Sequence, residues 1–146
     1  MFSKSESIQL RKLFWTSFGK SFPRKWVLYN TRIKGFSFKF VANQKQAMVC
    51  LDIESNDQVK NELLFEQILE LKNLLIEDYL PKIIFDNNYL LENGKSIHRI
   101  YVIHEESFNI HNKNTWLKTY EFFNTNMDKL ETFYEDFEDF IKQVIY

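Results

Sequence analysis

Apolar residues recur at three- and four-residue spacing in several stretches of the chain, which is the pattern of amphipathic helices. One stretch predicts a helix over about residues 4 to 20, opened by a Ser3–Glu6 capping box. A second predicts a long helix over about residues 57 to 79, opened by a Ser55–Gln58 capping box and ended by Pro81.

The C-terminal part of the chain predicts two further helices. A short one runs from about residue 112 to 123, and Asn124–Asn126 interrupts it because asparagine and threonine favour caps and turns. A long final helix follows, with its acids, Glu131 among them, opposite the apolar stripe. That stripe consists of Met127, Leu130, Tyr134, Phe137, Ile141 and Val144.

Two stretches change to a period of two, which is the pattern of half-buried strands. Residues 36–40 and 47–53 alternate in this way, and the aromatic and β-branched run 26–30 predicts a further short strand before them. A turn centred on Asn43 and Gln44 makes the first two an antiparallel hairpin. The expected facing pairs are Phe36 with Leu51, Phe38 with Val49, and Phe40 with Ala47.

A second hairpin is predicted around Asn93-Gly94, which is the strongest short-range signal for a two-residue turn. It joins residues 82–91 to residues 95–104. The element order predicts an α+β fold with antiparallel β-hairpins packed against two long helices and a helical C-terminus. The expected facing pairs are Glu92 with Lys95, Tyr89 with His98, Asn88 with Arg99, and Asp86 with Tyr101.

Composition favours one folded domain, residues 1–146. The chain has 15 Phe, 7 Tyr and 3 Trp, and aromatic side chains dominate core energetics where they are buried. Cys50 is the only cysteine, so neither an intramolecular disulfide nor a cysteine-based zinc cluster can form. This favours a reducing, cytoplasmic location, and the chain shows no signal peptide or membrane-length apolar run.

Charge divides the chain unevenly. The first 45 residues carry ten Lys or Arg and one acid, while the rest carry nine Lys or Arg and nineteen acids. Such a division marks either a nucleic-acid surface or parts of the fold, or of two subunits, that attract each other. The acids follow regular helix faces, beginning with Glu62, Glu66 and Glu70, whereas the cations are scattered. We therefore favour electrostatic matching, with a merely solvated acidic face as the alternative.

No catalytic, metal or cofactor site is predicted. His98 and His104 share one face of a predicted strand, but six residues separate them by roughly 20 Å. A zinc site needs closer ligands. Cys50 has no base beside it in sequence, so we expect a buried thiol and not a nucleophile.

Residues 29–35 combine an aromatic ring, two cations and a glycine between predicted strands, where functional loops tend to lie. Arg32 and Lys34 could contact phosphates, with Trp26 or Tyr29 as a stacking surface. The alternative is a solvent-exposed loop above an aromatic core.

The second hairpin carries Asp86, Asn88, Arg99 and Tyr101 on one predicted polar face. These residues form either a small recognition site or a cross-strand polar ladder. We favour the ladder, because such pairs commonly stabilise sheets.

Several short motifs are distributed over most of the chain: Phe14-Trp15-Thr16, Tyr29-Asn30-Thr31, Glu62-Leu63-x-Phe65-Glu66-Gln67, Arg99-Ile100-Tyr101 and Asn109-Ile110-x-Asn112-Lys113. Together they resemble a bacterial family of domains of unknown function and of similar length. The members of that family are stand-alone chains or the C-terminal part of larger proteins with nuclease-like regions.

The resemblance invites a test for a restriction-nuclease-like core. Such nucleases hold Mg²⁺ with an Asp on one strand and a Glu two positions before a Lys on the next. Asp52-Ile53-Glu54 is followed by Ser55 without a Lys, and Glu70-Leu71-Lys72 lies on a predicted helix. A degenerate core of this type fits the element order, but activity is not expected.

These observations favour a non-enzymatic, protein-binding or accessory module that binds another protein or a second copy of itself. A nucleic-acid-binding module and a divergent, inactive nuclease-like domain are the alternatives. We expect no cofactor and no membrane contact. The candidate binding surface consists of Trp26, Tyr29, Arg32, Lys34, Asp86, Arg99 and Tyr101.

Overall fold

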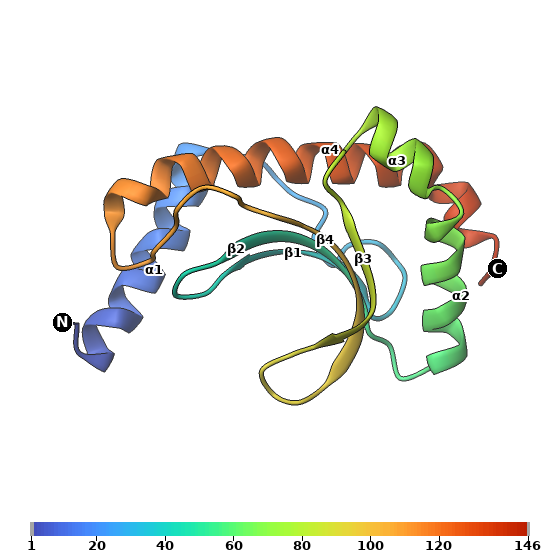
Figure 1. Cartoon of the computed structure of the whole chain (residues 1–146), viewed down its shortest axis with the longest axis horizontal. Helices are drawn as coiled ribbons and strands as arrows, with labels where there is room; N and C mark the ends of the chain where they lie inside the picture. Colours follow the sequence, from blue (N-terminus) through green and yellow to red (C-terminus); the bar gives the residue numbers. More distant parts are fainter. Residues whose placement is uncertain (1, 146) are drawn as a thin grey trace.

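A computed structural model, which describes residues 2–145, has a four-stranded antiparallel sheet and four α-helices (Figure 1). Met1 and Tyr146, the ends of the predicted domain, lie outside the described residues. The elements are α1 (Lys4–Ser21), β1 (Phe36–Ala42), β2 (Ala47–Ile53), α2 (Gln58–Leu69), α3 (Lys72–Asp78), β3 (Ile84–Leu90), β4 (Ser96–Ile103), the 3₁₀ turn η1 (Lys113–Thr115) and α4 (Trp116–Lys142).

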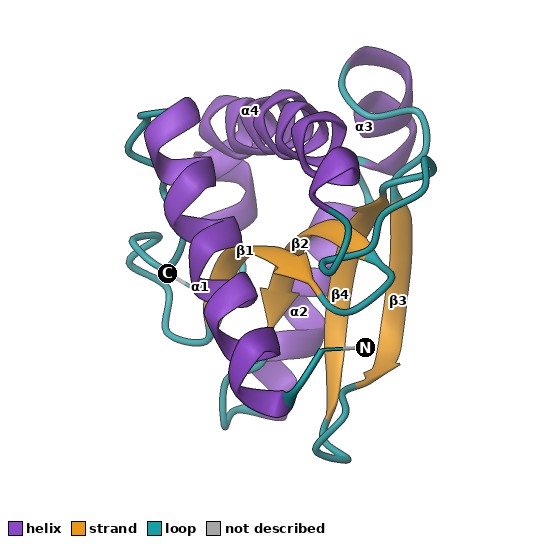
Figure 2. Cartoon of the chain, turned by 90° about the vertical axis from the view of Figure 1, so that its left-hand side faces the viewer, coloured by secondary structure: helices purple, strands orange, loops and turns teal. Residues whose placement is uncertain are grey.

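The strand order is β1-β2-β4-β3, so β1 and β3 are the edges of the sheet. The sheet is arched. In Figure 1, α4 runs along its convex side, α1 and α2 stand at its two ends, and the β3–β4 hairpin extends past the concave side. Figure 2 shows the same arrangement from one end, with α4 crossing over the strands. The predicted α+β fold class is confirmed.

The core is largely aromatic and joins α1 to α4. Phe14 of α1 is fully buried, and its backbone carbonyl accepts a hydrogen bond of 2.6 Å from the Tyr120 hydroxyl of α4. On the convex side of the sheet, Phe36 and Phe38 pack against Tyr134. The rings around Phe14 are those of Trp15, Phe108, Trp116, Tyr120 and Phe123.

The first hairpin forms with a different register from the predicted one. Its strands pair from Phe36 with Ile53 to Ala42 with Ala47, so each phenylalanine faces a residue two positions later than expected. The cause is the turn, because the Asn43 side chain accepts a 2.9 Å hydrogen bond from the Gln46 N–H and creates a four-residue connection. A shift of two leaves every side chain on its predicted face.

The second hairpin also departs from prediction, because its loop has three residues, 92–94. Gly94 takes φ 87°, and the Leu91 N–H donates to the Lys95 carbonyl at 2.8 Å. This is the type I turn with a glycine bulge that commonly closes three-residue hairpins. A further irregularity between Asp86 and Tyr89 shifts the register again. The four predicted facing pairs are therefore wrong; Asp86 lies opposite Arg99, and Tyr89 opposite Ile97.

The predicted helix over residues 57–79 is two helices, α2 and α3, separated at Glu70–Leu71. Asp57 caps α2, because its carboxylate accepts from the Lys60 N–H at 3.1 Å. Ser55 does not cap the helix; its hydroxyl bonds the buried side chain of Asn61 at 2.5 Å.

The C-terminal helix α4 is continuous, so the predicted interruption at Asn124–Asn126 is wrong. The Asn126 amide donates to the Phe122 carbonyl one turn earlier, at 2.9 Å. Its side chain is thereby satisfied inside the helix, and the buried side chains of Phe123 and Met127 on either side hold the helix against the core. Among the described residues, no helix is long and apolar enough to cross a membrane.

His104, just after β4, leads to a prediction about pH and stability. It is buried against Phe122, its Nε2 has no hydrogen-bond partner among the described residues, and burial lowers its pKa from 6.5. Below pH 6.5 the unfolded chain therefore takes up a proton that the folded chain resists, so stability should fall as the pH drops. His104→Leu should lose less stability between pH 7.5 and 5.5 than the wild type in urea unfolding. Parallel pH profiles of the two proteins would contradict this assignment.

Candidate functional site

The connection between α1 and β1, residues 22–35, is the first candidate site and is called the α1–β1 loop below. No strand forms at residues 26–30, contrary to the prediction, because the chain turns at residues 28–31. The loop still follows the free edge of the sheet, since the Leu28 carbonyl accepts from the Phe38 N–H of β1 at 2.9 Å.

Side chains of α4 hold the first half of the loop. Arg24 forms ion pairs with Asp128 at 2.5 Å and Glu131 at 3.3 Å. The second carboxylate oxygen of Glu131 accepts the Val27 N–H at 2.6 Å. Glu131 is only 2% exposed, so its predicted place on the outward face is wrong. Burial raises its pKa, and the Val27 N–H and Arg24 act in the opposite direction.

Buried Thr31 organises the second half of the loop. Its hydroxyl donates to the Phe36 carbonyl at 2.6 Å and accepts the Ile33 N–H at 3.2 Å. Its own carbonyl accepts from the Tyr134 hydroxyl of α4 at 3.3 Å. The hydroxyl and the carbonyl of this threonine therefore both hold the loop in its observed shape.

The backbone of the loop is strained. Leu28 has φ 50° and Arg32 has φ 63°, both in the left-handed region. This conformation costs a non-glycine residue about 1 to 2 kcal/mol, and a bulky side chain rarely adopts it. The hydrogen bonds to Glu131 and Thr31 offset that cost. The loop is thus held in one unusual shape by its surroundings.

This shape determines which of the candidate residues reach solvent. Tyr29 is 77% exposed, and Arg32 and Lys34 are exposed as well. Trp26 is buried, with its ring beneath the Arg24 guanidinium at 4.1 Å. The surface of the loop has an open depression of about 700 Å³, which is lined by Lys25, Trp26, Val27, Tyr29, Asn30 and Arg32.

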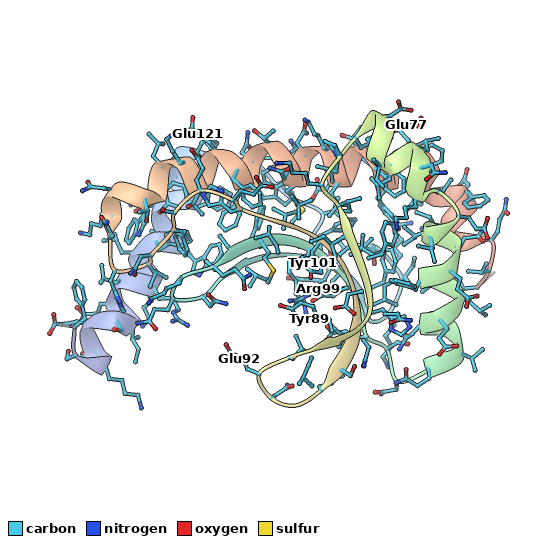
Figure 3. The ribbon with its side chains drawn as sticks, viewed as in Figure 1. Glu77, Tyr89, Glu92, Arg99, Tyr101 and Glu121 are labelled. Carbon is cyan, nitrogen blue, oxygen red and sulfur yellow. The ribbon has the colours of Figure 1, made fainter. Side chains whose placement is uncertain are left out.

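The remaining candidates lie on the concave side of the sheet, where Figure 3 labels Arg99 and Tyr101 beside Tyr89, and Asp86 lies opposite Arg99 in the strand pairing. Arg99 is only 5% exposed, and its guanidinium donates two hydrogen bonds, of 2.7 and 2.9 Å, to the Asp52 carboxylate. The Tyr89 ring lies over its guanidinium at 4.3 Å. Burial is the largest single effect on the pKa of Arg99 and acts to lower it, but the hydrogen bonds to Asp52 and the charge interactions with Asp52 and its neighbours together raise the pKa.

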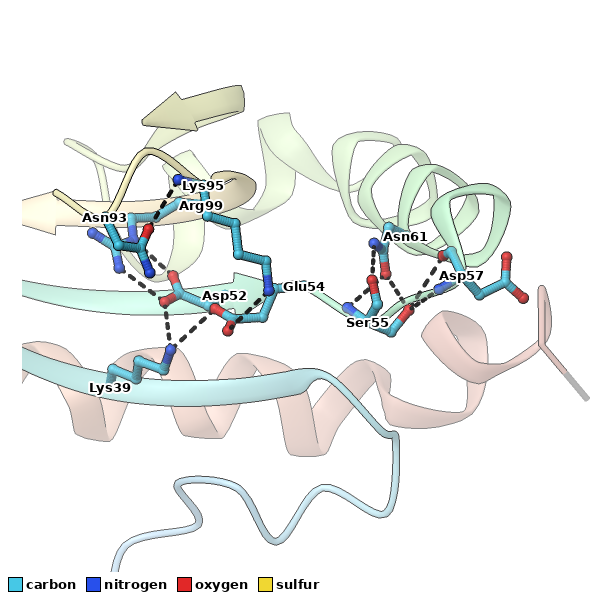
Figure 4. A network of polar contacts seen from close by, with 9 residues as sticks. All are labelled: Lys39, Asp52, Glu54, Ser55, Asp57, Asn61, Asn93, Lys95 and Arg99. Atoms are coloured by element: carbon cyan, nitrogen blue, oxygen red, sulfur yellow. Dashed lines mark hydrogen bonds and ion pairs between the residues drawn. The ribbon is translucent and has the colours of Figure 1, made fainter. Parts of the chain in front are cut away.

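A chain of ion pairs extends from Arg99 and Asp52 across the sheet (Figure 4). Lys39 of β1 contacts both Asp52 and Glu54 at 3.1 Å, and Lys95 lies 4.0 Å from Glu54. Cations therefore occupy both carboxylates of the nuclease-like Asp-x-Glu spacing. Within residues 2–145, no cluster of three or more His, Cys, Asp or Glu side chains is arranged to hold a metal ion.

The two groups of candidates do not form one site. The α1–β1 loop borders β1, whereas Asp86 lies on β3 at the opposite edge of the sheet. Trp26, Tyr29, Arg32 and Lys34 share the loop; Asp86, Arg99 and Tyr101 share the concave face.

A family model described as a domain of unknown function, DUF4268, matches residues 10–138. The chain belongs to the DUF4268 family. Comparisons with curated proteins and with solved structures yield no match. The match begins in α1 and ends in α4, so it includes both groups of candidate residues.

Sequence reasoning missed several residues that shape the loop of this DUF4268 domain. Leu28 looked like part of a strand, and Thr31 like an ordinary loop residue. Glu131 directly follows Leu130 and lies three residues before Tyr134, so it is at the border of the apolar stripe of α4. That position could have indicated that its side chain is buried. Cys50 is fully buried as expected, and burial raises the pKa of its thiol. It therefore stays protonated and unreactive.

Proposed function

We propose that this DUF4268 domain is a non-enzymatic module that binds another protein through the α1–β1 loop. The observation that carries the proposal is the strained, tightly held loop with Tyr29 exposed at its turn. Backbone strain persists only where surrounding contacts enforce it, and it concentrates at functional positions. A loop that is already ordered loses little entropy when it binds.

The charges around the loop favour a protein partner over nucleic acid. Asp128 and Glu131 of α4 neutralise Arg24. The pKa of Glu138 is lowered, mainly by the hydrogen bond that its carboxylate accepts from Lys142. The nearby charge of Arg32 contributes to the same shift. Acids placed among the cations repel phosphates. An exposed tyrosine with neighbouring arginine is the composition of a protein-binding hot spot.

The test compares the wild type with Tyr29→Ala and with the control Leu117→Ala, which removes an exposed apolar side chain from α4. Proteins captured by the wild type and the control but lost with Tyr29→Ala are purified and titrated by calorimetry. We expect Tyr29→Ala to weaken binding at least about tenfold, as hot-spot truncation does, and the control to weaken it less than about twofold. Equal affinity of a purified partner for all three proteins would refute the proposal.

The same proteins should be titrated with single-stranded and duplex nucleic acid. If the wild type binds nucleic acid with a salt-dependent affinity, and Arg32→Gln and Lys34→Gln weaken that binding, the partner of the loop is nucleic acid and not a protein. No such affinity is expected.

We further propose a bacterial, cytoplasmic setting in which the domain accompanies nuclease-like regions without cleaving nucleic acid itself. The family resemblance supports the association, and the reduced, buried Cys50 supports a reducing compartment. The occupation of Asp52 and Glu54 by lysine and arginine supports the lack of cleavage, because a metal ion would have to displace those cations.

A further inference from the structure

The exposed side of α1 carries a stripe of cations that have no acidic partner among the described residues. The stripe has residues at positions i, i+4, i+7 and i+8, which share one helix face. No ion pair joins its three cations to any of residues 2–145. At its centre, Ile8 is 49% exposed. We call this surface the basic stripe; it consists of Lys4, Ile8, Arg11 and Lys12.

The exposed side of α2 and its C-cap carries the opposite arrangement. Positions i, i+3, i+4, i+7 and i+11 place three glutamates and two apolar residues on one face. The three glutamates have no ion pair within the described chain. Val59 is 70% exposed and Leu63 is 40% exposed. We call this surface the acidic stripe; it consists of Val59, Glu62, Leu63, Glu66 and Glu70.

The two stripes match in length as well as in charge. The cations of the basic stripe extend over nine residues, from Lys4 to Lys12, and the acids of the acidic stripe extend over nine, from Glu62 to Glu70. Each interval is about 12 Å at the helical rise. Exposed apolar side chains lie among the charges in both stripes, so two such helices laid side by side would bury apolar surface between ion pairs.

Within one molecule the stripes cannot meet, because α1 and α2 stand at opposite ends of the arch (Figures 1 and 2). We infer that the basic stripe of one DUF4268 domain docks on the acidic stripe of a second copy. This joins two different surfaces, so the contact is head-to-tail, and repeated contacts produce an open chain or a closed ring. The uneven charge of the sequence would then be a device for self-assembly.

The contact should be weak and sensitive to salt, because exposed ion pairs contribute little each and are screened. Sedimentation velocity of the full chain tests it, over micromolar to millimolar protein at about 20 mM and about 500 mM salt. We expect the weight-average sedimentation coefficient to rise with concentration at low salt and to stay constant at high salt. A wild type that stays monomeric at low salt and the highest concentration overturns the inference.

Charge reversal identifies the surfaces. Arg11→Glu/Lys12→Glu makes both stripes acidic, and Glu62→Lys/Glu66→Lys makes both basic, so each variant alone should associate at least about tenfold more weakly than the wild type. Mixed in equal amounts, the two variants should recover association, because each supplies the stripe that the other needs. A mixture that remains monomeric while the wild type associates also overturns the inference.

A matched control separates this contact from the proposed binding loop. Lys25→Glu/Lys34→Glu changes the net charge by the same amount as Arg11→Glu/Lys12→Glu but lies in the α1–β1 loop. It should associate like the wild type. If this control loses association, the contact depends on the α1–β1 loop or on the net charge of the protein. Either result would overturn the inferred docking of the two stripes. Failure of the Tyr29 experiment leaves the sedimentation result unaffected.

Discussion

Asp52→Leu should destabilise the protein by about 3 to 5 kcal/mol, because it leaves the guanidinium of Arg99 buried without its partner. Removing one member of a buried pair costs far more than removing both, since the remaining charge stays desolvated. The double variant Asp52→Leu/Arg99→Met should therefore recover most of the loss. Urea unfolding of Asp52→Leu, Arg99→Met and the double variant gives the coupling free energy between the two side chains.

Glu54→Ala is the matched control for this prediction. Its carboxylate also contacts Lys39 and belongs to the same network, but it is partly exposed. Exposed and partly exposed pairs contribute about 0 to 1 kcal/mol, so the control should change stability by that amount. A loss in Asp52→Leu as small as in Glu54→Ala would show that the Arg99 charge finds solvent, and that the concave face is more open than its burial indicates.

Gly35→Ala should cost about 3 kcal/mol or more, for two reasons that add. Gly35 has φ 73°, and a Cβ atom there would lie 2.5 Å from backbone atoms of Ser55. Backbone atoms cannot rotate away as a side chain does. The Glu54 N–H also donates to the Gly35 carbonyl at 2.7 Å, so a shift of Gly35 would weaken the link between the α1–β1 loop and the end of β2.

The other two glycines are the controls. Gly94 also has a positive φ, of 87°, but open space surrounds its Cβ position, so Gly94→Ala should cost about 1 to 2 kcal/mol. Gly19 lies inside α1 with open space around it, and Gly19→Ala should stabilise by about 0.5 to 1 kcal/mol. Thermal unfolding should rank the three variants in this order, and equal losses in Gly35→Ala and Gly94→Ala would argue against the close approach to Ser55.

The fold class could be predicted because helical and strand periods are local properties of the chain. The Ser3 cap of α1 and the apolar stripe of α4 appear where the spacing placed them. Registers were predicted less well, because they depend on turn geometry. One hydrogen bond that the Asn43 side chain accepts and one left-handed glycine, Gly94, each moved the register of a hairpin without changing its strands.

The candidate site could be predicted only in part, for a reason that particular residues make clear. Tyr29, Arg32 and Lys34 were found because exposed loop chemistry is visible in sequence. The strain at Leu28 was not, because no sequence signal places a leucine in the left-handed region. The groups that hold it there, above all Glu131, lie about a hundred residues away in the chain.

The contacts of α1 and the α1–β1 loop with α4 affect the order in which the chain folds during synthesis. The hydrogen bonds between α4 and four earlier residues, Phe14, Arg24, Val27 and Thr31, connect positions 103 to 107 residues apart. At ordinary rates of synthesis, roughly 5 to 20 residues per second, about 5 to 20 seconds pass between the appearance of the two ends. During that time Phe14 lacks the hydrogen bond that its carbonyl accepts from the Tyr120 hydroxyl, and it lacks four of its neighbouring rings, those of Phe108, Trp116, Tyr120 and Phe123. We therefore expect α1 and the α1–β1 loop, although they are synthesised before α4, to be among the last parts of the domain to become native.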